Sequence, residues 1–103
     1  MALSARRYAQ ALFLIAEENG DQDQWLADLE VLASSSRNPD FIAFIDSPKI
    51  ENVKKIEVLK EAFSKSISDL ALNLVSLLAT RNYVASLSSI ADAFQELVDS
   101  EKG

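Results

Sequence analysis

Apolar residues recur three and four positions apart along most of the chain, which is the spacing of one face of an α-helix. Gly20, Asn38-Pro39 and Ser47-Pro48 divide this pattern into segments, because glycine and proline mark helix boundaries. No segment alternates apolar and polar residues as a half-buried strand does. The sequence therefore predicts an all-α protein, a bundle of six consecutive helices.

Capping residues predict where the first three helices begin. Ser4 is placed to cap the first helix, and Gly20 to end it. Asp21 and Gln24 resemble a capping box for the second helix. Asn38, followed by proline, is expected to cap a short third helix.

The last three helices have similar start signals. The fourth is expected to begin near Asn52, Ser66 and Asp69 to cap the fifth, and the sixth to follow Asn82. Residues 99–103 are expected to fray. In the second, fourth and sixth helices, the predicted core positions are Trp25, Leu26, Leu29, Leu32, Ala33, Ile56, Leu59, Phe63, Tyr83, Leu87, Ile90, Phe94 and Leu97.

The first and fifth helices carry more apolar surface than one core contact requires. At ~3.6 residues per turn, their apolar residues cover arcs of about 200° and 220°, against about 100° for a minimal core stripe. The simpler explanation is that both helices are central and buried on several sides. The alternative is that each leaves one edge exposed, so that together they form a groove for an amphipathic helix of another chain.

Composition limits the possible functions. The 103 residues include no Cys and no His, and 49% are hydrophobic, enough for a single domain with a real core. The net charge of −6 disfavours nucleic-acid binding, and no apolar run is long enough for membrane insertion. Basic residues gather in one region but alternate with glutamates, which indicates a solvated helix face: Lys49, Lys54, Lys55, Lys60 and Lys65.

Residue types that build catalytic or metal sites are missing or scattered. The sequence contains no nucleophile with a base, no glycine-rich phosphate loop and no cluster of metal ligands. Asp21 and Asp23 are more simply explained as a cap and a favourable contact with a helix N-terminus. We therefore expect no enzyme activity, no cofactor and no metal.

Four segments, in this order, resemble the delta subunit of F-type ATP synthases, the bacterial counterpart of the mitochondrial oligomycin-sensitivity-conferring protein. They are ARRYAQALFLIA (5–16), FIAFIDSPKI (41–50), KKIEVLKEAF (54–63) and LVSLLATRNYVASLSSIADAF (74–94). The resemblance implies a six-helix N-terminal domain that binds the amphipathic N-terminal helix of an alpha subunit between its first and fifth helices. It thus implies a non-catalytic adaptor that links the catalytic head to the peripheral stalk.

Residues at positions that match the family's groove are expected to bind the partner helix. The partner-helix groove implied by the resemblance is lined by Tyr8, Ala11, Leu12, Ile15, Asn73, Leu74, Leu77 and Arg81. The chain departs from the family at Gln10 and Leu14, where charged residues are common, and in the turn Thr80 to Tyr83, which leaves the role of its arginine open. An unrelated helical interaction module or a self-associating bundle is the alternative.

The resemblance also sets expectations for the protein around this chain. Family members continue into a C-terminal domain that engages the stalk b subunits, so residues 1–103 are expected to be one domain of a longer subunit. Contact with b subunits would then require the absent domain. The expected location is peripheral, on the cytoplasmic face of the inner membrane or in a plastid, and the isolated domain is expected to be monomeric.

Overall fold

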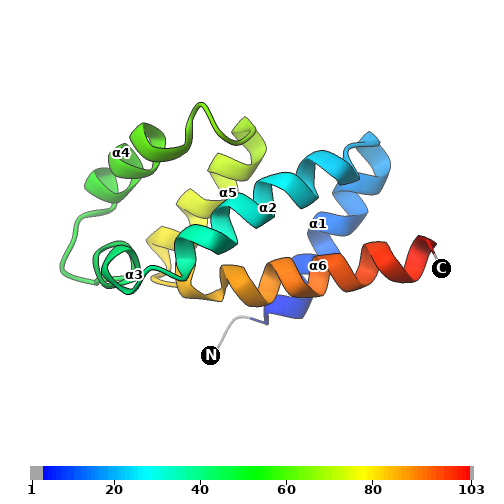
Figure 1. Ribbon diagram of the computed structural model, residues 1–103. Helices are drawn as coiled ribbons and strands as arrows, with labels where there is room; N and C mark the ends of the chain where they lie inside the picture. The colour runs from blue at the N-terminus through cyan, green and yellow to red at the C-terminus, as the bar shows by residue number, and fades with distance from the viewer. Residues whose placement is uncertain (1–3, 103) are drawn as a thin grey trace.

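The structure is a computed structural model that describes residues 4–102, and this part of the chain contains six α-helices and no strand (Figure 1). The prediction of an all-α, six-helix fold is confirmed. A single 3₁₀ turn, η1, precedes the last helix. The elements are α1 (Ala5–Asn19), α2 (Gln22–Ser36), α3 (Pro39–Ile45), α4 (Asn52–Phe63), α5 (Asp69–Thr80), η1 (Val84–Ser86) and α6 (Leu87–Lys102).

The helices pack in two groups, α1 and α2 with α6, and α4 with α5, around one core. α6 lies along both α1 and α2, whereas α4 packs on α5 and α3 on α2. Figure 1 shows α3 and α4 at the end of the molecule opposite the C-terminus. Edge-to-face aromatic pairs join Phe13 to Phe94, with ring centroids 5.8 Å apart, and Phe41 to Phe63, at 6.2 Å. Such pairs add directional contacts to the burial of apolar area.

Most of the predicted core positions are buried, including Trp25, Leu59 and Phe94. Ile56 is only half-buried, and the half-buried Leu26, Tyr83 and Leu97 pack against the edge of the core. In the last turns of α6, Val98 takes the buried place beside the half-buried Leu97. The helical period of 3.6 explains this shift, because a strict three-four alternation drifts around a straight helix.

Three of the predicted helix boundaries have the expected geometry. The Ser4 Oγ atom accepts from the Arg7 backbone N–H at 3.3 Å, and the Asn38 side chain accepts from the N–H groups of Asp40 and Phe41. Gly20 adopts φ +68°, the left-handed conformation that glycine tolerates best.

The capping box predicted at Asp21 is wrong. The Asp21 side chain makes no capping hydrogen bond, and its buried Oδ1 atom has no partner among the described residues. The end of α1 explains this, since the Asp21 backbone N–H donates to the Ala16 carbonyl at 3.0 Å. That bond gives Asp21 a backbone with φ −119° and ψ 33° rather than the extended conformation typical of an N-cap.

The predictions for the last two helix starts need correction. Ser68, not Ser66, caps α5, because the Ser66 and Ile67 N–H groups still bond back to the Phe63 carbonyl and delay the cap. α6 begins only at Leu87 and not directly after Asn82. Asn82 adopts the left-handed conformation with φ +56°, and the η1 turn then separates it from α6.

The expected fraying of residues 99–103 stays a prediction, because a helix assignment at this end does not test it. α6 continues through Lys102, and Gly103 lies outside the described residues. The polar sequence of this end does not prevent helix formation, because Val98 is still anchored in the core and Gln95 donates to Asp99 at 2.9 Å.

Candidate helix-binding surface on α1 and α5

One edge of α1 is apolar and accessible. Ile15 is 43% exposed and Ala11 is exposed, whereas Leu12 is buried and Tyr8 packs half-buried against the core. These four residues fall within about 100° of the helix circumference. The predicted α1 residues therefore form an edge that runs from the core out to solvent.

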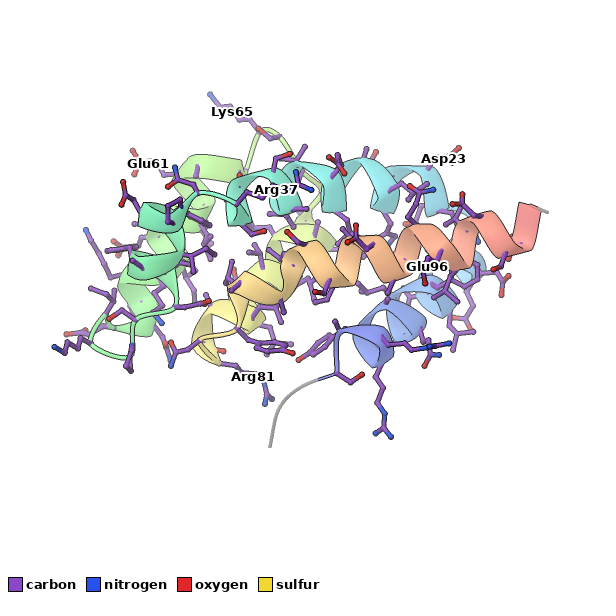
Figure 2. The ribbon with its side chains drawn as sticks, turned by 60° about the horizontal axis from the view of Figure 1, so that its bottom comes forward. Asp23, Arg37, Glu61, Lys65, Arg81 and Glu96 are labelled. Atoms are coloured by element: carbon purple, nitrogen blue, oxygen red, sulfur yellow. The ribbon has the colours of Figure 1, made fainter. Side chains whose placement is uncertain are left out.

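α5 has an edge of the same kind. Leu77 is 44% exposed, Asn73 and Arg81 are exposed, and Leu74 is buried. In Figure 2, Arg81 projects from the turn after α5 on the side of the molecule where α1 begins. Here too a buried apolar residue, Leu74, lies beside the exposed Leu77, and the polar residues Asn73 and Arg81 lie next to them.

Two exposed leucines beside these edges were not among the predicted site residues. Leu70 is 49% exposed and lies seven residues before Leu77, two turns away on the same edge of α5. Leu14 is 62% exposed and lies beside Ala11 on α1. The i, i+7 spacing with Leu77 could have identified Leu70 from the sequence.

The exposed side chains show that the wide apolar arcs of α1 and α5 are not completely buried. Leu12 and Leu74 belong to one core cluster, but α1 and α5 are not among the closely packed helix pairs of the described chain. Of six large apolar residues exposed in that part, four lie on these two helices: Leu14, Ile15, Leu70 and Leu77. Burial by neighbouring helices is therefore incomplete, and it is incomplete on the predicted edges.

Lys55 holds the C-terminal end of α5 from α4. The predicted solvated face is wrong for this lysine, which is only 1% exposed. Its Nζ atom donates to the Ala79 carbonyl at 3.1 Å and to the Asn82 side-chain oxygen. A signal was present in the sequence, because Lys55 precedes Leu59 and Phe63 at intervals of four and so lies on the buried stripe of α4.

Asp28 holds the other end of α5 from α2. It is 1% exposed, and its two carboxylate oxygens accept from the Gln24 side chain at 2.9 Å and from the Ser68 backbone N–H at 3.2 Å. Sequence reasoning missed this residue too. Its spacing from Trp25 and Leu32, three and four residues away, places it on the buried face of α2.

Three shallow depressions lie elsewhere on the described surface. The largest, about 430 Å³, is lined by Lys49, Ile50, Glu51, Val53, Lys54 and Glu57 beside the start of α4. Another lies between Arg6 and the last turns of α6. None of the three is lined by the eight predicted groove residues.

The third depression is acidic and lies where α1 and α6 end, near Asp23 (Figure 2). A hydrogen bond with Glu101 and the negative charge of that carboxylate raise the pKa of Glu17. In residues 4–102, no group of three or more potential metal ligands is placed to hold a metal ion.

Comparison with known proteins identifies the family. The family model described as ATP synthase delta (OSCP) subunit matches residues 4–103. The chain belongs to this family. Similar relatives include the subunits delta of Beijerinckia indica, 38% identical over 101 residues, and Oceanobacillus iheyensis, 36% identical over 100 residues; these alignments cover 96% of this chain and 53% and 55% of the relatives.

A plastid relative is similar over the same region. The chloroplastic ATP synthase subunit delta of Cyanidium caldarium is 32% identical over 96 residues, which cover 92% of this chain and 52% of the relative. The chain therefore spans about half the length of the curated relatives it matches. No helix in the described part of this delta-family chain is both long and apolar enough to cross a membrane.

Proposed function

We propose that this chain is a non-catalytic adaptor of an F-type ATP synthase, which binds the amphipathic N-terminal helix of an alpha subunit along α1 and α5. In the complete subunit it would link the catalytic head to the peripheral stalk, at the periphery of the membrane-bound complex. The observation that carries the proposal is the pair of exposed apolar edges, with Ile15 on α1 and Leu77 on α5.

The surface has the composition of a site that binds one face of a helix. Buried leucines, Leu12 and Leu74, supply an apolar floor, and Ile15, Leu70 and Leu77 can bury further area against a ligand. The polar ends, Asn73 and Arg81 among them, can fix register through hydrogen bonds.

The dimensions also suit a single helix. α1 has 15 residues and α5 has 12, which correspond to lengths of about 22 and 18 Å. A partner helix of three to four turns would match them and bury an interface near ~1,200 Å² in total. Moderate affinity is expected for an isolated peptide, with additional contacts strengthening attachment in the complete enzyme.

Calorimetric titration with a peptide of the cognate alpha-subunit N-terminus tests this proposal. We expect one-to-one binding that Ile15→Asp and Leu77→Asp each weaken at least about tenfold, because a charge would be buried against the apolar face of the peptide. Val53→Asp is the control, since Val53 is an exposed apolar residue of α4, outside the candidate surface. Circular dichroism checks that each variant stays folded.

Two results would contradict the proposal. Equal loss of affinity in all three variants would place the peptide elsewhere or make its binding nonspecific. Absence of binding by the wild type, with concentration-dependent dimers in light scattering, would instead favour self-association through the same apolar edges.

A further inference from the structure

α5 is anchored at both ends by buried charged side chains that come from two different helices. Asp28 of α2 accepts from the Ser68 N–H at the N-cap, and Lys55 of α4 donates to the Ala79 carbonyl in the last turn. Each side chain is 1% exposed. No other helix in the described part of the chain has hydrogen bonds from buried charged side chains at both of its ends.

The signs of these charges match the field of the helix. The N-terminus of an α-helix has unpaired N–H groups and a partial positive charge, and its C-terminus has unpaired carbonyls and a partial negative charge. Asp28 places a carboxylate at the first and Lys55 an ammonium group at the second. Both contacts are therefore favourable where they are, although neither charge forms an ion pair with a side chain of the described residues.

Lys55 adds a contact beyond the end of α5. Its second acceptor is the side-chain oxygen of Asn82, whose backbone is left-handed with φ +56°. Asn82 directly follows Arg81 of the candidate surface. The lysine thus connects α4 to the turn that determines where Arg81 leaves the helix.

We propose that Asp28 and Lys55 are positioning residues that fix the rotation and register of α5, so that its exposed edge is preorganised for a partner helix. This inference rests on the proposed function. Neither residue lies on the candidate surface: Ala79, which Lys55 contacts, is about 160° around α5 from Leu77. Both would act through α5 and not by touching the ligand.

A small rotation would be enough to matter. A turn of α5 by about 20° moves atoms at a radius of ~5 Å by about 2 Å, which is sufficient to misplace Leu77 against a rigid ligand face. An apolar residue in place of Lys55 could fill the same volume without the cost of burying an ammonium group. An apolar side chain, however, cannot donate hydrogen bonds to the Ala79 and Asn82 oxygens, so it does not fix the orientation of α5.

The test measures peptide affinity and amide hydrogen exchange in the wild type, four single variants and one double variant. Lys55→Met removes the donor at similar volume, Asp28→Asn removes the charge at similar shape, and Asn82→Gly removes one acceptor while tolerating φ > 0. The control is Ile45→Val or Ile45→Ala, chosen to match the loss of stability of Lys55→Met. Ile45 is a buried residue of α3 that lies outside the candidate surface. Titrations are made at a temperature where every protein is folded by circular dichroism.

We expect Lys55→Met to weaken alpha-subunit peptide binding roughly three- to tenfold, with a smaller loss for Asp28→Asn and none for the Ile45 control. Exchange should accelerate selectively in the last turn of α5. If Lys55 acts through Asn82, the double variant Lys55→Met/Asn82→Gly should bind no worse than Lys55→Met alone.

The inference is overturned if Lys55→Met binds like the stability-matched control and its exchange rises uniformly over the bundle. Its failure is distinguishable from that of the proposed function. If the wild type does not bind the peptide, the proposed function fails, and exchange alone then decides the positioning role: selective acceleration in α5 supports it, and uniform acceleration overturns it.

Discussion

α1 and α5 have the same wide apolar arc in the sequence, but the bundle holds them by different means. α1 is positioned by shape: Ala9 and Ala16 are fully buried, and Phe13 packs edge-to-face on Phe94 of α6. α5 also buries Val75 and Leu78 completely, but it has directional contacts from Asp28 and Lys55 in addition. Two helices with similar hydrophobic patterns can therefore respond to different perturbations.

The difference has a consequence for binding. Packing contacts tolerate small sliding movements better than hydrogen bonds do, because even an edge-to-face aromatic pair has a weaker directional preference. Hydrogen bonds weaken steeply when their angle changes, so they fix rotation more firmly. We infer that α5 is the more rigid side of the candidate surface and α1 the more adaptable one.

The largest effect is expected from removing the aromatic anchor of α1. Phe94→Ala should lower the free energy of unfolding by about 3 to 5 kcal/mol, because the ring is completely buried and leaves a cavity. Urea unfolding followed by fluorescence of the buried Trp25 measures this loss. A decrease below about 1 kcal/mol would contradict the view that shape complementarity holds α1.

A smaller loss of stability is expected when the N-cap residue of α5 or of α1 is replaced. Ser68→Ala should cost about 1 to 2 kcal/mol and Ser4→Ala about 0.5 kcal/mol, since Ser68 is half-buried and Ser4 is exposed. Thermal unfolding measures both, with the exposed Ser64→Ala as the control. Equal losses at the two caps would remove this distinction between the helices.

The smallest effect is expected at the C-terminal end of α1. Glu101 raises the pKa of Glu17 above its ordinary value of 4.5, so the folded state binds more protons than the unfolded state as pH rises through that range. The contribution of Glu17 to stability therefore falls with rising pH above about 4.5. Glu17→Gln should remove this decline and raise the melting temperature slightly at pH 7. Glu18→Gln serves as the control, and a steeper decline in Glu17→Gln would contradict the assignment.

The helices and most of the core could be predicted from the sequence because they depend on local period and turn residues. Gly20 and Asn38-Pro39 were sufficient to place two boundaries. The Asp21 and Ser66 caps were wrong because the end of the preceding helix controls the backbone there, through bonds to Ala16 and Phe63.

The candidate surface was predictable only in part. The helical period predicted wide apolar arcs on α1 and α5, yet which edge of each arc is exposed depends on where α6 and α4 pack. The burial of Lys55 could have been predicted from its spacing to Leu59 and Phe63, but its acceptors could not, since Ala79 and Asn82 lie 24 and 27 residues away. Such long-range polar contacts leave no trace in local hydrophobic patterns.

The most direct test of the central claim is a map of backbone amide chemical shifts in the ¹⁵N-labelled chain during titration with the alpha-subunit peptide. The account predicts that the largest changes at one-to-one stoichiometry fall on both edges together, at residues 8–15 of α1 and at residues 70–81, in α5 and the turn after it. Changes centred on the depression around Lys49 and Val53, or confined to one of the two helices, would contradict it.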